Sequence, residues 1–504
     1  MALAMQLLVL LVTLFTSQLV YLVVARLFLS PLRAFPGPKW AALTEWWEVL
    51  HTARCDRFIV IQKLHEQLGP VVRIGPNHLS IASSKTFQHV FVTKCSSFVK
   101  SDFYATIQPG VGDKYSGLFN FTDHARSVQE RRDLQPMFSP ASLRKMEGRF
   151  EPLLDQMVLE MKKRDEMDMF NLLKYLLLDA IGDLAFGESF GQLQTGEEHQ
   201  YVTDFNRAFM LIGLQVTFSW LIPFIPYLPL KPVKDAYFGL QRVFKYAQER
   251  VDAYLASDDD KSGTLLSGYL DTKTGQPKEP YTPWTVAIAG HGFVVAGSES
   301  SSITIAYMLY LLIKHPEVEK RLRAELATLP PNYSSTDLAG LRYFDAFLRE
   351  TLRIFPPAPS PMPRVVPAEG FTIEGVTYPP HTIVSSQPYS IHRDPKVFDR
   401  PATFDPDRWL TDSKELKDLM TKAFIPFSAG QRGCLGRGLA WIHMQKTLAR
   451  LLDEFEGFEM TRGMTDNDME MIERGALAKP RGTKLWVKYR VRRREERLKE
   501  GHSD

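Results

Sequence analysis

The segment 427–436, Phe-Ser-Ala-Gly-Gln-Arg-Gly-Cys-Leu-Gly, holds Cys434 among three glycines and one arginine. Apolar residues recur with helical spacing from Leu439 to Leu451, so we expect an amphipathic helix to begin just after the cysteine. A thiolate at the start of a helix is stabilised by the positive end of the helix. As an iron ligand, a thiolate pushes electron density onto haem iron and favours O–O cleavage. The alternative for an isolated cysteine is a free thiol buried in a core.

The neighbours of Cys434 fit a flat anionic ligand. Gly430 and Gly436 have no Cβ, which lets the backbone approach a macrocycle. Arg432 can form a charge-assisted pair with a haem propionate. The segment therefore predicts a loop that binds haem.

This segment resembles the haem-binding signature of the cytochrome P-450 superfamily, F-x-x-G-x-R-x-C-x-G. Each fixed position is matched, by Phe427, Gly430, Arg432, Cys434 and Gly436. The resemblance extends over nearly the whole chain. It implies a haem b cofactor whose iron takes Cys434 as its axial thiolate, with the other four residues in the cofactor-binding loop.

The resemblance also gives meaning to a Glu-x-x-Arg pair, Glu350 and Arg353. Spacing alone predicts an i,i+3 surface ion pair of little energetic weight. In the family, such a pair joins a third residue, matched here by Arg408, to lock the support of the haem loop. Arg364 and His392 match positions that bind propionates in relatives.

The stretch 296–301, Ala-Gly-Ser-Glu-Ser-Ser, resembles the element with which the family activates oxygen. The resemblance implies that small residues leave room for dioxygen, that Glu299 shuttles protons and that Ser300 donates them. The family usually has threonine at position 300; serine keeps the hydroxyl but loses the methyl group that fixes the rotamer. The alternative is a polar kink in a core helix.

A second departure concerns Arg131. Relatives place an aromatic residue or a histidine four positions before this basic residue, and Ser127 stands there instead. We expect Arg131 to contact the haem, with a solvated basic face as the alternative.

The elements that position these residues begin with a membrane anchor. Residues 1–25 carry no charged side chain and are long enough to cross a bilayer core, so we expect a transmembrane segment over residues 1–28. The alternative, a cleaved signal peptide, lacks a basic start and a clear cleavage site. Positive charge follows the span and none precedes it, which predicts a lumenal N-terminus and a cytosolic body. We therefore expect a single-pass protein of the endoplasmic reticulum membrane.

Residues 29–45 contain a Pro/Gly stretch that cannot continue a helix and is expected to act as a stiff hinge. Residues 46–490 form the expected haem-thiolate catalytic domain, and residues 491–504 a charged tail. A net charge of +3 gives no indication of nucleic-acid binding, and three unpaired cysteines indicate a reducing compartment.

The fold class is mainly α with a small β subdomain, as in the cytochrome P-450 fold. Helical periodicity is clear over 173–186 and 301–314. We expect one hairpin from 71–75 and 78–81, and a second from 371–377 and 382–386 around Pro379-Pro380.

The uncharged stretch 208–230 is interrupted by Pro223, Pro226 and Pro229, which makes it a poor second membrane span. Trp220, Phe224 and Tyr227 favour a surface element that dips into the bilayer or covers an apolar pocket. A buried core helix followed by a Pro-rich loop is the alternative. We expect the substrate to contact this stretch, the loop after Lys100 and residues 357–362.

Segments at 69–81, 100–104 and 117–120 resemble fungal enzymes, including the benzoate para-hydroxylase group and oxygenases of secondary metabolism. The resemblance implies a monooxygenase that receives electrons from NADPH through a separate NADPH-cytochrome reductase and inserts one atom of dioxygen into a lipophilic small molecule. An aromatic-acid hydroxylase is the alternative enzyme; its carboxylate substrate would need a buried cationic or hydrogen-bonding partner. A membrane protein that binds haem without turnover is the alternative from another class.

Overall fold

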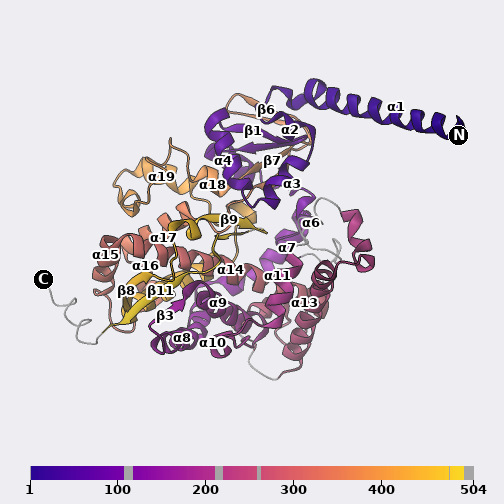
Figure 1. Cartoon of the computed structure of the whole chain (residues 1–504). Coiled ribbons are helices and arrows are strands. Elements are labelled where there is room, and N and C mark those ends of the chain that lie inside the picture. The colour runs from indigo at the N-terminus through magenta and orange to yellow at the C-terminus, as the bar shows by residue number, and fades with distance from the viewer. Residues whose placement is uncertain are drawn as a thin grey trace.

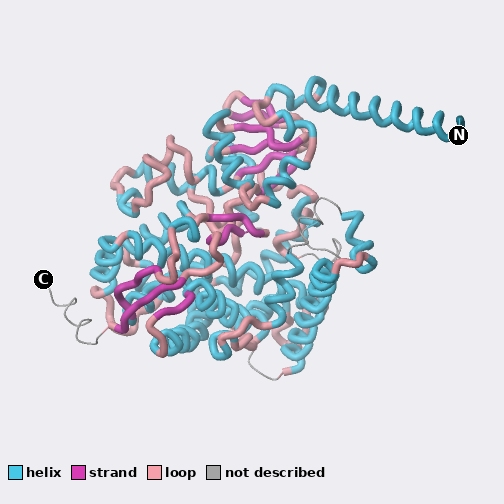
Figure 2. Tube along the Cα trace, viewed as in Figure 1, coloured by secondary structure: helices cyan, strands magenta, loops and turns pink. Residues whose placement is uncertain are grey.

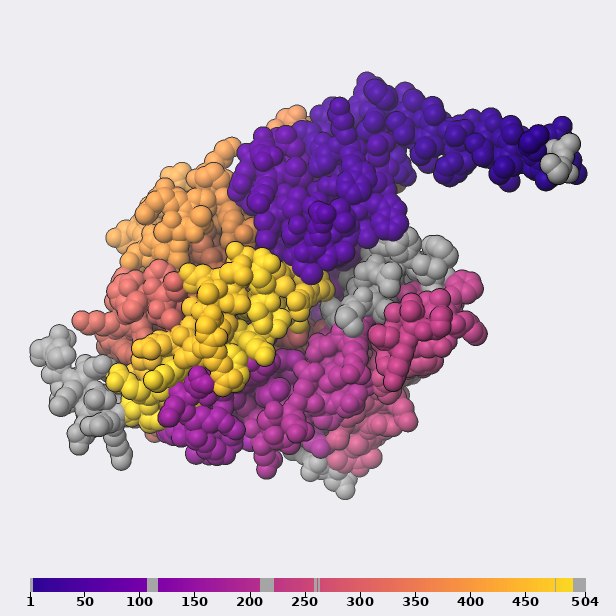
Figure 3. Space-filling model, in the orientation of Figure 1, coloured from indigo at the N-terminus to yellow at the C-terminus, as the bar shows by residue number. Residues whose placement is uncertain are grey.

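The computed structural model describes residues 2–106, 117–209, 219–257, 261, 263–475 and 477–492. Helix α1 (Ala2–Val24) extends away from the rest of the protein as a lone rod (Figures 1 and 3). The apolar helical stretch Leu3–Leu29 is long enough to cross a membrane, and its most apolar part is not buried against the body. Such a surface is costly in water, so α1 is suited to a lipid environment.

The segment after α1 packs against the body. It contains the short helices η1 (Ala25–Leu29), η2 (Pro31–Ala34) and α2 (Lys39–Leu43). The Arg73 guanidinium, which is buried, donates hydrogen bonds to the Arg26 carbonyl at 3.1 Å and the Ser30 hydroxyl at 3.3 Å. A Cβ at Gly37 would lie 2.2 Å from the Arg73 carbonyl oxygen. The proline-rich segment is therefore held to the first strand by contacts that fix its direction.

The sheet beside this segment has the strand order β1-β2-β7-β4, formed by β1 (Val71–Gly75), β2 (His78–Ile81), β7 (Ile383–Ser386) and β4 (Met362–Val365). Strands β1 and β2 form the first predicted hairpin, which is confirmed. Strand β7 pairs with β2 in parallel and with β4 in antiparallel orientation. Figure 2 shows these strands gathered near the base of α1.

The second predicted hairpin is wrong in its partners. Strand β5 (Phe371–Ile373) pairs with β6 (Val376–Tyr378), whereas β7 belongs to the four-stranded sheet. The turn lies at Glu374 and Gly375, whose φ angles of 52° and 76° suit a two-residue hairpin loop. Pro379 and Pro380 follow the end of β6 and do not form the turn of the hairpin.

The helical body is built around α14 (Pro283–Lys314), a 32-residue helix. A capping box between Thr282 and Thr285 and a proline at the first helical position start this helix. Helix α9 (Met169–Phe186) packs closely along it: a Cβ added at Gly290 or Gly297 would lie 2.7 Å from α9 side chains. The periodicity over 173–186 and 301–314 is thus confirmed as helix.

The largest core cluster joins α8, α9, α14, α17 and α20 to the sheet at the C-terminal end of the chain. The longer helices are α3 (Trp46–Ala53), α4 (Arg57–Leu68), α7 (His124–Leu134), α8 (Pro140–Lys162), α11 (Gln200–Phe209), α13 (Lys231–Ala256), α15 (Pro316–Leu326), α17 (Arg342–Ile354), α19 (Lys414–Ala423) and α20 (Arg437–Glu454). The short ones are α5 (Ser84–Phe87), η3 (Gln88–Thr93), α6 (Phe103–Thr106), η5 (Gln135–Phe138), α10 (Gln192–Thr195), η6 (Ser219–Tyr227), η7 (Leu265–Tyr269), α16 (Ser335–Ala339), α18 (Pro388–Ile391), η8 (Pro406–Leu410), η9 (Gly430–Arg432) and η10 (Asp466–Met469). The remaining strands are β3 (Glu166–Asp168), β8 (Phe455–Met460), β9 (Met471–Arg474), β10 (Leu477–Pro480) and β11 (Trp486–Val491).

The Pro-rich half of the stretch 208–230 lies at the surface. Element η6 contains Pro223 and Pro226, and the side chains of Phe224 and Tyr227 are 57% and 83% exposed. Ile225 between them is buried against Ala236 of α13. The Pro-rich half is therefore a surface element anchored by the apolar side chain of Ile225. Residues 210–218 and the side chain of Trp220 lie outside the described residues.

Candidate haem site

Cys434 lies between η9 and α20, in a loop whose backbone closes on itself. The Cys434 amide donates to the Phe427 carbonyl at 2.8 Å, and Gly430 adopts a φ of 66°. A Cβ at Gly430 would lie 2.4 Å from the Phe91 carbonyl oxygen, so this glycine is needed where η3 packs against the loop. From the sequence we expected Gly430 to allow close approach of a macrocycle. In the structure, the close contact that requires a glycine is with the protein backbone at Phe91.

The Cys434 thiol is exposed at the surface of the loop, just before the first turn of α20. Burial of the surrounding site raises the pKa of Cys434, while the Gly436 amide and the guanidinium groups of Arg131 and Arg437 oppose this rise. Among the described residues, no group of three or more His, Cys, Asp or Glu side chains could hold a metal ion. A metal centre at this place therefore has to bring most of its own ligands, as a porphyrin does.

Three cations lie close enough to one another to interact: Lys100, Arg364 and Arg432. Lys100 and Arg364 are buried. Within the described ranges their side chains donate only to backbone carbonyls, Lys100 to Phe119 and Arg364 to Phe98 at 3.3 Å. Burial and the charges of the two arginines lower the pKa of Lys100 well below its usual value.

The Nε atoms of Arg364 and Arg432 are buried and have no hydrogen-bond partner in the described part of the chain. Buried cations without a counter-charge are costly unless an anion completes the site. These residues therefore fit the two carboxylates of a haem. Lys100 was not predicted to belong to this group, because a single lysine between Val99 and Ser101 carries no local signal of burial.

Arg432 also donates to the carbonyl oxygens of Phe121 at 3.0 Å and Asp123 at 3.1 Å, which joins the cysteine loop to the start of α7. Arg131, on α7, donates to the Gly433 carbonyl at 2.7 Å. Arg131 is thus not part of a solvated face. It holds the residue next to Cys434, and Ser127, one turn before it, is buried.

Glu350 and Arg353 form a fully buried ion pair, with both Arg353–Glu350 contacts between 2.7 and 2.8 Å. Arg408 adds a third charge at 3.0 Å, and the Trp409 indole donates to the same carboxylate at 2.9 Å. The spacing-based alternative of a weak surface pair is excluded by this burial. Because every oxygen of the carboxylate is bonded, the cluster rigidly ties α17 to the segment that precedes the cysteine loop.

His392 belongs to this support. Its Nδ1 lies 3.2 Å from the Arg353 carbonyl, and its Nε2 accepts from the Ile425 amide at 2.9 Å. Burial lowers the pKa of His392 well below its usual value. Both ring nitrogens are occupied by backbone, so this geometry does not provide the propionate contact that the resemblance implied.

Helix α14 presents one poorly covered face in its middle, where Gly292 and Ala296 are exposed and Ser300 is partly exposed. These residues are spaced i, i+4 and i+8 and therefore share a face. The Ser300 hydroxyl donates to the Ala296 carbonyl at 2.9 Å. Gly297 faces Ile181 on α9 instead, so its small size serves helix packing.

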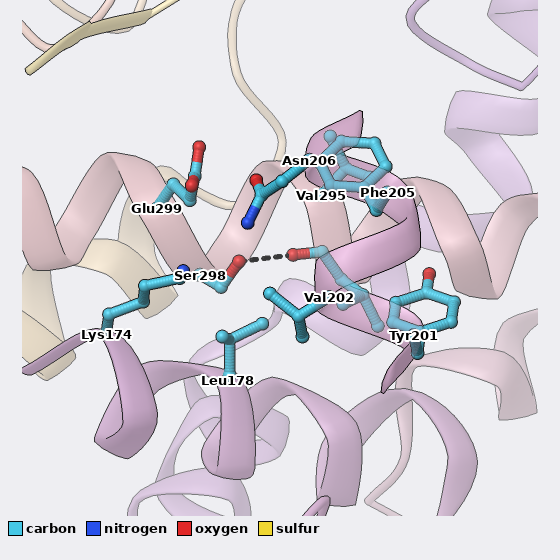
Figure 4. A pocket seen from close by; sticks show the side chains of 10 residues that line it. Lys174, Leu178, Tyr201, Val202, Phe205, Asn206, Val295, Ser298 and Glu299 are labelled. Carbon is cyan, nitrogen blue, oxygen red and sulfur yellow. Dashed lines mark hydrogen bonds between the residues drawn. The ribbon is translucent and has the colours of Figure 1, made fainter. Parts of the chain in front are cut away.

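Glu299 lies beside this face and forms an ion pair with Lys479 on β10, with Oε1 and Nζ 2.7 Å apart. Glu299 also borders a narrow pocket between α9, α11 and α14, lined by Leu178, Val202, Phe205 and Asn206 among others (Figure 4). In Figure 4 its carboxylate points away from Leu178 and Val202. The pocket is mostly apolar and was not predicted from sequence. Of the segment after Lys100 that we expected near the substrate, residues 107–116 lie outside the described residues.

Three features lie together in the described part of the chain: a cysteine at the start of a helix, cations that form no ion pair, and an uncovered face on a central helix. They fit a planar anionic cofactor held through a thiolate. The family model for cytochrome P450 matches residues 36–487. The chain belongs to the cytochrome P450 family, and it is an oxidoreductase that incorporates oxygen.

The chain is similar to several fungal enzymes. It is 32% identical to the cytochrome P450 monooxygenase tazI of Aspergillus terreus over 457 residues, which cover 88% of this chain and 91% of that protein. It is 29% identical to averantin hydroxylase of Aspergillus parasiticus, with 92% and 93% covered. It is 28% identical to the cytochrome P450 monooxygenase orf2 of Aspergillus niger, with 92% and 94% covered. The predicted resemblance to fungal enzymes of secondary metabolism is confirmed. Members of the family use haem with a cysteine thiolate, a redox partner, dioxygen and a small-molecule substrate.

Proposed function

We propose that this chain is a membrane-anchored monooxygenase that inserts one atom of dioxygen into a lipophilic intermediate of fungal secondary metabolism. Electrons come from NADPH through a separate membrane-bound NADPH-cytochrome reductase. The observation that carries the proposal is the cysteine loop beside the buried cations Lys100 and Arg364 and the half-buried Arg432, none of which forms an ion pair with an acidic side chain among the described residues. Such an arrangement is unfavourable for a folded protein unless a dianionic cofactor completes it.

Cys434 would ligate the iron, and Arg364, Arg432 and Lys100 would hold the propionates. The sequence contains no Cys-x-x-Cys-His segment for covalent attachment, which supports haem b. When bound, the haem supplies the oxidising chemistry. Phe427, Gly430 and Gly436 shape the loop, and Arg131 fixes the Gly433 carbonyl next to the ligand. The Glu350–Arg353–Arg408 cluster keeps this loop in place before the cofactor arrives.

On α14, Glu299 is proposed to move protons and Ser300 to present a hydroxyl to the oxygen site. The two side chains are adjacent in sequence; in this structure the Glu299 carboxylate pairs with Lys479, and the Ser300 hydroxyl donates to the Ala296 carbonyl. Proton transfer therefore requires the Ser300 hydroxyl to rotate from its own helix. Serine rotates more freely than threonine, because it has no γ-methyl group.

The substrate is proposed to contact the loop after Lys100, the stretch 208–230 and residues 357–362. A carboxylate substrate would need a buried cationic or hydrogen-bonding partner. The buried cations Lys100 and Arg364 are those proposed to hold the propionates, which supports a neutral lipophilic substrate over an aromatic acid. The retained acid and hydroxyl on α14 support turnover over simple haem binding.

We assign residues 1–28 to an anchor in the endoplasmic reticulum membrane and residues 29–45 to the proline-rich hinge that orients the body. Residues 46–490 form the cytosolic catalytic domain, and 491–504 a charged tail, which lies almost wholly outside the described residues. The uncharged rod α1 and the cations that follow it support this orientation.

The test is the carbon monoxide difference spectrum of reduced membranes that carry the wild-type chain or Cys434→Ala. A strongly red-shifted Soret band in the wild type alone is expected. A band that survives the substitution, or a wild-type chain without haem, would contradict the proposal. Wild-type membranes with added reductase should then consume oxygen when NADPH is supplied, and lipophilic fungal metabolites can be screened for oxidation.

A further inference from the structure

The hairpin of β9 and β10 is firmly attached to the body before its contact with Glu299 is considered. The Glu473 amide donates to the Cys55 carbonyl, and the Ala478 amide donates to the Pro357 carbonyl, both at 2.9 Å. The buried carboxylate of Glu473 accepts from Arg57 and from the Ser360 hydroxyl. The position of Lys479 is therefore determined by the fold and does not depend on the ion pair that its side chain makes.

Lys479 reaches α14 from this hairpin. Its ammonium group lies 2.7 Å from the Glu299 carboxylate, and the two side chains are 18% and 17% exposed. The partners are 180 residues apart in sequence, so tertiary packing brings them together. An ion pair that is largely withdrawn from water is less screened than a surface pair and holds its partners in a narrower range of positions.

We propose that Lys479 is a positioning residue for proton delivery: its ion pair fixes the Glu299 carboxylate beside the poorly covered face of α14 that carries Ala296 and Ser300. This inference rests on the proposed function, in which Glu299 moves protons. Without Lys479, the glutamate side chain regains its rotamers and spends less time where it can pass a proton to the Ser300 side of α14. Lys479 acts through Glu299 and does not touch the reacting atoms.

Delivery of protons can be measured without knowing the substrate. When the enzyme and its reductase consume oxygen alone, release of hydrogen peroxide uses one NADPH, one proton and one O2. Reduction of O2 to two waters uses two NADPH and two protons. Slow proton delivery favours peroxide, so the peroxide formed per O2 consumed reports on the relay, and the NADPH consumed per O2 provides an independent check.

The experiment compares wild type, Lys479→Met, Lys479→Arg and Glu299→Gln as haem-loaded proteins with reductase and NADPH. K479M should raise the peroxide-to-water ratio about threefold, less than the about 100-fold typical of removing a general acid. K479R, which retains the positive charge, should stay close to wild type. E299Q should raise the ratio more than K479M, and the double variant K479M/E299Q should equal E299Q, because the lysine acts through the glutamate.

A matched control is Arg481→Met. Arg481 pairs with Glu470 at 2.6 Å at the end of the same hairpin, and both side chains are at least half exposed. R481M should leave the ratio unchanged. A K479M ratio equal to that of wild type, or to that of R481M, overturns the inference while the function stands. A wild type without the red-shifted carbon monoxide band, or an E299Q ratio equal to that of wild type, instead overturns the function or the relay on which the inference rests.

Discussion

Replacing Lys100 with methionine should weaken haem binding. Lys100 is buried, and the nearest charges are those of Arg364 and Arg432, which have the same sign. Because no acidic side chain among the described residues pairs with Lys100, a haem propionate would be its anionic partner. Loss of one hydrogen bond to a charged group costs about 1.5–3 kcal/mol, which corresponds to about 10- to 100-fold in affinity. Methionine avoids the cost of burying an ammonium group, so we expect a loss near the lower end, about tenfold.

The assay is the rate at which haem leaves the holoprotein for an excess of a haem-scavenging protein, followed by the change in the Soret band. K100M should release haem about tenfold faster than wild type, and Lys100→Arg should lie between them. Lys94→Met is the matched control, since Lys94 is exposed in the same segment of the chain. Equal rates for K100M and K94M would refute the assignment of Lys100 to the propionates.

Three further predictions concern stability. Glu350→Gln leaves two guanidinium groups buried against a neutral amide and should lower the free energy of unfolding by about 3 kcal/mol or more. The Soret band should then be lost at a lower temperature. Asp418→Asn, in an exposed i,i+4 pair, is the control and should cost less than about 0.5 kcal/mol; equal losses of stability would contradict the role of the buried cluster. Gly297→Val should overpack the contact with Ile181 and lower the free energy of unfolding by about 1–3 kcal/mol. Adding Ile181→Ala to this variant should restore part of the lost stability. If it does not, the contact with Ile181 is not the cause of the loss. Burial raises the pKa of Glu130 from 4.5 to about 7; because the folded state holds this proton more tightly, stability should fall by about 3 kcal/mol as the pH rises from 4.5 through 7. Denaturant titrations at several pH values should show this slope in wild type and a flatter one in Glu130→Gln.

Some features were predictable because contiguous residues encode them. The candidate membrane anchor is a run of uncharged residues, and the proposed haem loop is a ten-residue segment followed by a helical repeat. The helix around residues 301–314 and the hairpin from 71–75 and 78–81 follow from local periodicity and turn residues. In each case the residues that form the feature are neighbours, so the signal survives without knowledge of the fold.

Other features depend on which segments meet. The second hairpin was predicted with the wrong partner, because Ile383–Ser386 carries no local mark of its pairing with β2, about 300 residues earlier. His392 matched a propionate-binding position, yet the fold places its two nitrogens against the backbone at Arg353 and Ile425. Residue type and motif position do not determine which hydrogen-bond partners burial leaves available.

The sequence by itself thus determined the family, the helix that follows Cys434 and the apolar N-terminal helix that could cross a membrane, since these are local patterns. Only the tertiary structure decided that Glu350 is fully buried, that Lys100 joins two arginines and that Lys479 holds Glu299. The physical reason is that the energy of a charge depends on its surroundings. Water screens an exposed ion pair, which therefore contributes little to stability. A buried charge that loses its partner is strongly destabilising. Which charges are buried depends on how the whole chain packs.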